Sequence, residues 1–266
     1  TTGSGADSLT GGSGGDVFAA GGNADFVFGQ GGDDIINGGD GNDVLAGGFS
    51  DASIANTGND LIHGGAGGDL IRGGDGANEL HGDDGDDTIY GSVLDVIDGG
   101  DGIDTLHLDA SSATDAINAD ISASAFTLTG IATPLTSIEH LLSLSTGAGD
   151  DTISVVALLS GQMSFSGGGG FDHFTGDFSA ATSALSLSNF AITSFGSGLQ
   201  ISLSGFEALT LTGGSGDDTL QGTANNDVLR GGAGAVSYST SQRQDILAGR
   251  GGNDDFYSAG AGGIAD

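Results

Sequence analysis

The sequence has no cysteine, no lysine and a single proline among its 266 residues. Without cysteine there is no disulfide and no thiolate to bind a metal or act as a nucleophile. A Walker phosphate loop needs a lysine and is excluded as well. Only four arginines stand against 36 acidic residues, and the net charge of −32 excludes nucleic acid as a partner. No apolar run reaches the roughly 18 residues that span a bilayer, so we expect no membrane insertion.

Glycine and aspartate dominate what is present. The chain has 55 glycines, and all but three of its acidic residues are aspartate. Hydrophobic residues make up 36% of the chain, so there is enough apolar material to bury despite the charge. Short carboxylates beside glycine are typical of turns and of ligand loops. We therefore expect a folded chain in which something offsets the acidic charge.

A period of nine residues organises residues 2–107. Each repeat follows the pattern G-G-x-G-x-D-x-U-x, in which U is apolar. The repeats begin at Thr2, Gly11, Ala20, Gly29, Gly38, Gly47, Gly64, Gly73, Gly82, Gly91 and Gly99. The repeat at Gly47 carries an insertion over residues 49–56, and the repeat at Gly91 is one residue short. Both changes fall in predicted turns, as a stacked repeat structure requires.

With this pattern the sequence resembles the haemolysin-type calcium-binding nonapeptide repeats of the RTX (repeats-in-toxin) family. The resemblance implies an all-β fold, a parallel β-roll or β-solenoid. In such a roll each repeat gives one loop and one short strand, two repeats complete a coil, and several Ca²⁺ ions lie between stacked glycine-rich loops.

The residues support this fold independently. Position eight of every repeat is apolar and predicts a thin, ladder-like core, because successive strand residues face opposite ways. Glycine at positions one, two and four permits positive φ, so each loop can turn sharply. The residue at position six then places a carboxylate at the end of the loop. There, a hard cation with about six to eight oxygen ligands can be shared between loops.

Because successive repeats alternate sides, the position-six residues of every second repeat should stack. One predicted column of ligands contains Asp7, Asp25, Asp43, Asp69, Asp87 and Asp104, and the other contains Asp16, Asp34, Asp60, Asn78 and Asp95. Weaker or missing sites are expected at Asn78, which lacks a charge, and at Asp95, which lies in the shortened loop. The gaps between loops would hold about nine calcium ions, and the metal-free chain should be largely disordered.

Residues 108–212 contain a duplication with longer coils. A shift of 68 residues superposes 99–104 on 167–172 and Ile138-Glu139 on Phe206-Glu207. After a slip of one residue, 147–153 matches 214–220. Alternating segments at 185–187 and 199–203 predict strands. We therefore expect a long-coil section continuous with the roll of residues 1–107, and Asp151 and Asp172 as further ligands.

The nonapeptide pattern resumes over residues 213–266, with repeats at Gly213, Gly222, Gly231 and Gly249. Their predicted metal ligands are Asp218, Asp227, Asp245 and Asp254. We interpret the third repeat as carrying a nine-residue insertion that contains Tyr238 and Arg243. The last repeat stops without the polar cap that solenoids normally need, so we expect a truncated roll or copies that stack end to end.

Two other features leave alternatives open. His63 and His81 occupy position nine, two repeats apart, and should stack on one sheet face with Asp98 next. They form either a transition-metal site or, as the simpler interpretation, an exposed ladder. Position seven is apolar in the early repeats: Val17, Phe26, Ile35, Val44, Leu61 and Leu70. Such residues are either good strand formers or a surface covered by self-association or by a neighbouring segment of a longer chain.

No catalytic motif is supported, and we expect that the chain is not an enzyme. Residues 11–15 fit G-x-S-x-G, but without the strand-to-helix context that the motif needs. The resemblance implies export by a bacterial type I system and an extracellular or cell-surface location. The first functional hypothesis is a calcium-binding structural segment of a surface layer, fibre, matrix or adhesin protein. The second is an accessory repeat module of a secreted RTX enzyme or toxin.

Overall fold

The computed structural model describes residues 3–48, 58–122, 125–156, 161–194, 198–240, 245–249, 255–258 and 264–265. Every regular element in these ranges is a β-strand. No helix in the described ranges is long and apolar enough to cross a membrane. The chain divides into two compact units, which are Thr1–Asp109 with Ala132–Leu142, and Ala110–Ile131 with Ser143–Asp266.

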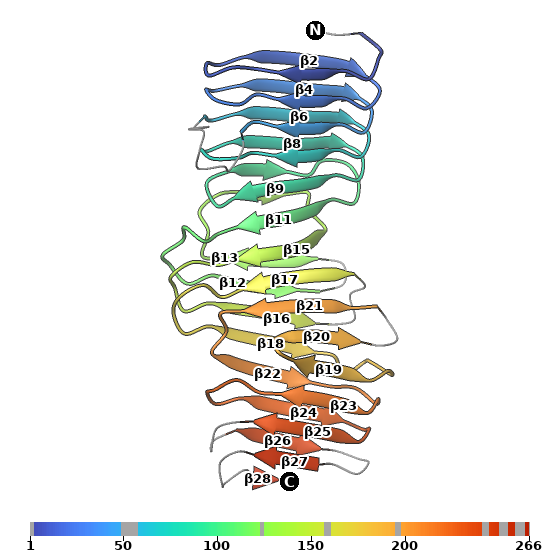
Figure 1. Cartoon of the computed structure of the whole chain (residues 1–266), viewed down its shortest axis with the longest axis vertical. Helices are drawn as coiled ribbons and strands as arrows, with labels where there is room; N and C mark the ends of the chain where they lie inside the picture. Colours follow the sequence, from blue (N-terminus) through green and yellow to red (C-terminus); the bar gives the residue numbers. More distant parts are fainter. Residues whose placement is uncertain are drawn as a thin grey trace. The chain divides into compact units, whose positions relative to one another are not determined.

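In the first unit, alternate repeats feed two parallel sheets, whose strands are stacked like rungs (Figure 1). One sheet has the strands β1 (Ser8–Thr10), β3 (Phe26–Phe28), β5 (Val44–Ala46), β7 (Leu70–Arg72), β9 (Thr88–Ser92) and β11 (Thr105–Asp109), in this order. The other sheet runs through β2 (Val17–Gly22), β4 (Ile35–Asp40), β6 (Leu61–Ala66), β8 (Glu79–Asp84), β10 (Val96–Asp98) and β14 (Leu135–Thr136). This arrangement is the predicted parallel β-roll.

The core of the first unit is the predicted ladder of position-eight side chains. Parallel pairing in constant register places each of these residues beside its counterpart two repeats away. The side chains are fully buried at Val27, Ile36, Leu45, Ile62, Ile71, Leu80, Ile89, Ile97 and Leu106. Most strands of the first unit thus add one large inward side chain, and β11 adds two, Leu106 and Leu108.

The second unit is built from longer coils. One sheet has the order β13 (Phe126–Thr129), β12 (Asn118–Ile121), β16 (Thr152–Val156), β18 (His173–Asp177), β22 (Ala208–Thr212), β24 (Val228–Gly232), β26 (Ile246–Gly249) and β28 (Ile264–Ala265). The facing sheet has the order β17 (Gln162–Ser166), β21 (Gln200–Ser204), β20 (Ala191–Ser194), β19 (Leu185–Ser188), β23 (Asp218–Gln221), β25 (Val236–Thr240) and β27 (Asp255–Ser258). The strand β15 (His140–Ser145) contains the boundary between the two units.

Each copy of the duplicated module contains antiparallel pairing within the otherwise parallel roll. In the first copy β12 pairs antiparallel with β13, and in the second copy β20 pairs antiparallel with both β19 and β21. The predicted strands at 185–187 and 199–203 correspond to β19 and β21. The hairpins widen the coil, and the apolar side chains that fill it are larger than in the first unit.

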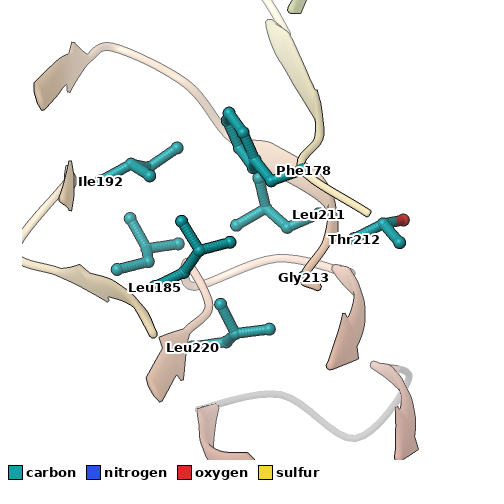
Figure 2. Close-up of a pocket in the computed structure, with 8 residues that line it drawn as sticks. Phe178, Leu185, Ile192, Leu211, Thr212, Gly213 and Leu220 are labelled. Atoms are coloured by element: carbon teal, nitrogen blue, oxygen red, sulfur yellow. The ribbon is translucent and has the colours of Figure 1, made fainter. Parts of the chain in front are cut away.

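An apolar cavity lies in this wider core (Figure 2). Phe178, Leu185, Ile192, Leu211 and Leu220 point towards one another around it, and all five are buried. Its lining side chains carry no charge. The cavity therefore belongs to the packing of the long coils.

The structure corrects the interpretation of residues 231–248. Val236 and Tyr238 lie in β25, in register with Asp218 and Leu220 of β23, so residues 231–239 form a complete repeat. Tyr238 is fully buried at the core position and donates a hydrogen bond to the carbonyl oxygen of Ala248 at 2.6 Å. The predicted nine-residue insertion is therefore wrong. The repeat was missed because its sixth residue is valine, and the next repeat begins at residue 240.

The alternation of buried and exposed positions can be tested with two neighbouring isoleucines. Ile36 is fully buried, whereas Ile35 is 46% exposed. In buffer containing calcium, Ile36→Ala should lower the free energy of unfolding by about 2–5 kcal/mol, because the cavity it leaves cannot be refilled. The matched change Ile35→Ala should cost less than about 1 kcal/mol. Urea unfolding followed by circular dichroism measures both, and equal losses would contradict the assigned core.

Candidate metal centre

The position-six residues of the first unit stack in the two predicted columns. The backbone N–H of each donates a hydrogen bond to the Oδ1 atom of the position-six residue two repeats later. In one column the N···O distances are 2.7 Å for Asp7 to Asp25, 2.8 Å for Asp25 to Asp43, 2.7 Å for Asp43 to Asp69, 2.7 Å for Asp69 to Asp87 and 2.8 Å for Asp87 to Asp104. In the other they are 2.8 Å for Asp16 to Asp34, 2.9 Å for Asp34 to Asp60, 2.9 Å for Asp60 to Asn78 and 2.8 Å for Asn78 to Asp95.

Two glutamates that sequence reasoning did not count as site residues continue these columns. The N–H of Asp104 donates to Oε2 of Glu139 at 2.9 Å, and the N–H of Asp172 donates to Oε2 of Glu207 at 2.8 Å. The duplication aligned Glu139 with Glu207, which was the available signal. The nonapeptide pattern did not identify them because its sixth position is aspartate. Here the longer side chain of glutamate, at the end of a long coil, accepts the hydrogen bond that Oδ1 of aspartate accepts in the shorter repeats.

The second unit repeats this arrangement with shorter columns. Asp151 accepts a hydrogen bond from the N–H of Ile117 at 2.7 Å and donates its own N–H to Asp172 at 2.8 Å. Further on, Oδ1 atoms accept from backbone N–H groups at 2.9 Å for Leu185 to Asp218, 2.8 Å for Leu209 to Asp227 and 3.0 Å for Asp227 to Asp245. Asp254 and the insertion at 49–56 lie outside the described residues.

The second carboxylate oxygen of most of these residues has no partner. The Oδ2 atom is buried and makes no hydrogen bond in Asp25, Asp34, Asp43, Asp69, Asp87, Asp104, Asp151, Asp172, Asp218 and Asp245. Leaving a buried polar atom unpaired costs about 1–3 kcal/mol, and more for a charged group. A row of such oxygens therefore calls for a cation.

In seven of these ten repeats the residue at position one is glycine, which leaves space beside the orphaned oxygen. Ala20, Thr146 and Thr240 take this position before Asp25, Asp151 and Asp245. A Cβ atom on Gly38 would collide with Oδ2 of Asp43 and with the carbonyl oxygen of Gly64, and a Cβ atom on Gly64 would collide in the same way with Asp69 and Gly82. Carboxylate and carbonyl oxygens are the ligands that Ca²⁺ takes. The residues present thus fit a hard divalent cation.

The prediction that position-one glycines adopt positive φ is wrong. In the repeat at Gly38, positive φ occurs at Gly39 (109°) and Gly41 (143°), which are positions two and four. Gly38 itself is not among the positive-φ residues. Positions two and four of this repeat are thus glycine for the turn, whereas at position one a Cβ atom on Gly38 would crowd the carboxylate.

Burial of like charges strongly perturbs these carboxyls. Removal from water, followed by the charges of Asp69 and Asp104, raises the pKa of Asp87 to about 7. Burial and neighbouring aspartates likewise raise the pKa of Asp60, Asp69 and Asp172 to about 6 each. Hydrogen bonds from backbone N–H groups oppose the shift without cancelling it. A cation beside these groups would favour the ionised form and oppose the rise in pKa.

Three position-six aspartates have a donor for the second oxygen as well. Oδ2 of Asp95 accepts from the N–H of Ser92 at 2.6 Å, and its Oδ1 accepts from the Nδ2 of Asn78 at 2.9 Å. Asp227 accepts from the N–H of Thr223 at 2.7 Å, and Asp16 from the N–H of Gly12 at 2.9 Å. These contacts support the expectation of weaker or missing sites at Asn78 and Asp95, which stays a prediction.

The family model described as RTX calcium-binding nonapeptide repeat (4 copies) matches residues 1–27, 20–51, 45–80, 63–93, 95–111 and 210–235, together just over half of the chain. The chain belongs to this family. Calcium is therefore the cation that its repeats bind, and the matched ranges contain both aspartate columns of the first unit. A comparison with curated proteins finds no match.

In this RTX protein, Asp25, Asp43, Asp69, Asp87 and Asp104 would hold calcium in one column, and Asp34 and Asp60 in the other. Calcium would supply positive charge between carboxylates that otherwise repel. The chain would supply oxygen ligands that its backbone hydrogen bonds already fix in place. Asp151, Asp172 and Glu207 would have the same roles in the second unit.

A glycine-to-alanine pair tests the space beside the orphaned oxygens. Gly38→Ala should remove about one or two calcium ions per chain and raise the calcium concentration at the folding midpoint, because its methyl group takes ligand space. Gly14→Ala is the matched control, since a Cβ atom there meets nothing within 4 Å. Calorimetric titration counts the ions. Identical ion counts and midpoints in the two variants would show that position one is not part of the site.

A pH titration tests the perturbed carboxyls. Their folded-state pKa values of about 6 to 7 lie above the unfolded value of about 3.9, so the metal-free fold binds more protons than the unfolded chain over this interval. Its stability should therefore increase as the pH falls from above 7 towards 4, and be lost as the pH rises through 7. In chelator, circular dichroism should show β-structure gained as the pH falls below about 7. A loss of β-structure as the pH falls from above 7 towards 5 would contradict the assignment.

Proposed function

We propose that this chain is a calcium-driven structural segment of an extracellular or cell-surface protein. The observation that carries the proposal is the set of buried Oδ2 atoms without hydrogen-bond partners, repeated along both units. With a net charge of −32 and one large inward side chain in most strands of the first unit, the metal-free chain has little to hold it together. Folding of the chain then requires calcium.

An extracellular location suits sites of this kind. Calcium sites in extracellular modules commonly have dissociation constants of about 10⁻⁴–10⁻³ M, which match the calcium concentration outside cells. A chain that stays unfolded at low calcium can pass through a narrow export channel and fold on arrival. Secretion from a bacterium by a type I system, as is typical of RTX proteins, fits this sequence of events.

The outer faces of the first unit support a role in assembly. Val17 is 74% exposed, Phe26 is 49% exposed and Ile35 is 46% exposed, and all three occupy position seven. Val17 and Ile35 lie on the neighbouring strands β2 and β4, whereas Phe26 lies on β3 of the other sheet. Exposed apolar side chains on these outer faces favour contact with another protein surface. In a surface layer, fibre, matrix or adhesin, the partner that contacts these side chains would be a second copy of the chain.

The second candidate function is an accessory calcium-binding module of a secreted RTX enzyme or toxin. The match to the RTX repeat model supports it as well, since the repeats themselves carry the match. The exposed position-seven side chains would then contact a neighbouring domain of the same polypeptide. In either case we propose that this chain itself is not an enzyme.

A calcium titration distinguishes the two roles. Chelated protein is followed by size-exclusion chromatography with light scattering while calcium rises from micromolar to millimolar. The structural role predicts a calcium-dependent increase to large, regular assemblies. The variant Phe26→Ser with Val17→Ser should still contract with calcium but should no longer assemble, because it removes the apolar contact and leaves the aspartate columns intact.

Two other outcomes decide against parts of the proposal. A smaller hydrodynamic radius at constant mass would support the accessory module and reject assembly. No change in radius or mass would reject calcium-driven folding altogether.

A further inference from the structure

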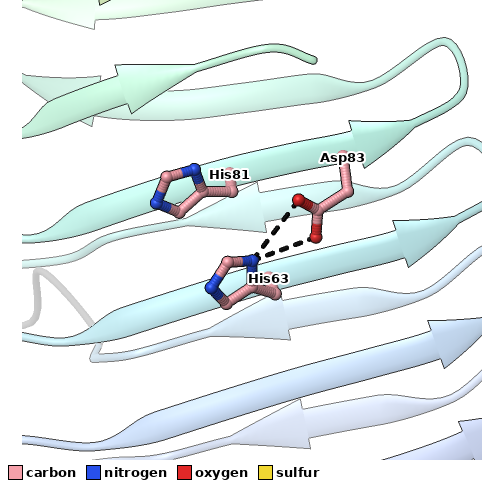
Figure 3. Close-up of side chains that lie close together, drawn as sticks. All are labelled: His63, His81 and Asp83. Carbon is pink, nitrogen blue, oxygen red and sulfur yellow. Dashed lines mark hydrogen bonds and ion pairs between the residues drawn. The ribbon is translucent and has the colours of Figure 1, made fainter. Parts of the chain in front are cut away.

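Two histidines and an aspartate meet on the outer face of the sheet that contains β6 and β8 (Figure 3). His63 and His81 are paired in register on these neighbouring strands, and their rings stack with centroids 4.6 Å apart at 7°. Asp83 lies on the same strand as His81, and its Oδ2 atom is 3.1 Å from Nδ1 of His63. One potential ligand atom from each of the three lies within 4.8 Å of the others.

The backbone at Asp83 adopts a positive φ, as glycine does at the same position of other repeats. Asp83 occupies position two of its repeat with φ of 70°, and it pairs with Gly65, whose φ is 110°. Glycine holds the same position in the repeats at Gly38 and Gly99, with φ of 109° at Gly39 and 103° at Gly100. Aspartate tolerates the left-handed region better than most side chains, and Gln30 also occupies position two of its repeat, with φ of 77°. Position two therefore accepts aspartate, which places a carboxylate beside His63.

The surroundings supply further metal-site features. Glu79 lies 3.1 Å from Nε2 of His81, which is the contact by which a carboxylate orients a metal-ligating imidazole. On the next strand Asp98 is paired with His81, and its Oδ1 atom is buried without a hydrogen-bond partner. His63, His81 and Asp83 keep side-chain exposures of 35%, 22% and 37%, so an ion can reach them from solvent.

We propose that His63, His81 and Asp83 bind one divalent transition-metal cation, such as Zn²⁺, at a site separate from the calcium columns. Imidazole nitrogen suits zinc, copper and nickel, whereas Ca²⁺ takes oxygen ligands. Two imidazoles and one carboxylate give zinc three protein ligands and leave a fourth position for water. The ligand atoms lie within 4.8 Å of one another, so the three side chains would have to draw closer together around the ion. The ion would then link two adjacent coils of the roll.

The site can be tested in the full chain with millimolar calcium present, where the roll is formed. Calorimetric titration with ZnCl₂ should show one tight zinc ion per chain that calcium does not displace. His63→Asn and His81→Asn should each weaken zinc binding by at least about tenfold. His140→Asn is the control, because His140 is a histidine of the same unit that lies outside the cluster.

Asp83→Gly is the decisive variant, because glycine is the residue that other repeats use at this position. It should fold with calcium as the parent does, yet bind zinc at least about tenfold more weakly. Titration with Co²⁺ reports ligation directly, since the parent should develop visible absorption bands and Asp83→Gly should not. Zinc affinity that is equal in all variants, or zinc that calcium displaces, would overturn the proposal.

Discussion

The structure depends on one constraint, which is that parallel stacking places identical residues directly above one another. In each aspartate column this brings carboxylates together out of water, where their charges repel and cannot be solvated. Each column satisfies Oδ1 with the N–H of the preceding layer, so every aspartate fixes the spacing to its neighbour. The other oxygen is left facing the gap between loops. A cation in that gap would attract the carboxylates on both sides of it and so offset their mutual repulsion.

The rest of the repeat serves this geometry. The position-one glycine keeps the gap open, while glycines at positions two and four turn the chain towards it. The apolar ladder holds the two sheets together with one side chain per strand, and that is a thin core for so large a charge. Burial of apolar surface and binding of cations are therefore coupled. Neither the ladder nor the columns can form without the constant register that both require.

Much of this architecture could be predicted from the period alone, because a strict repeat fixes register. The nine-residue period directly predicts the aspartate columns, the burial of Ile36 and the alternation of successive repeats between the two sheets. Glu139 and Glu207 could not be found in this way, since the long coils break the count and glutamate is absent from the pattern. Val236 was missed for the opposite reason: its repeat has the right length but lacks the acidic residue that marks the others.

The irregular repeats show what the regular ones need. Where the stack contains Asn78, its amide donates to Asp95, and a short loop supplies a second donor from Ser92. The N–H of Thr223 likewise donates a hydrogen bond to Oδ2 of Asp227. In the repeat at Gly231, the uncharged Val236 takes the place of the position-six aspartate. In each case the chain itself neutralises or satisfies the oxygen that a cation would otherwise meet. The number of cations should therefore follow the orphaned Oδ2 atoms and not the number of aspartates, because only those oxygens lack an alternative partner.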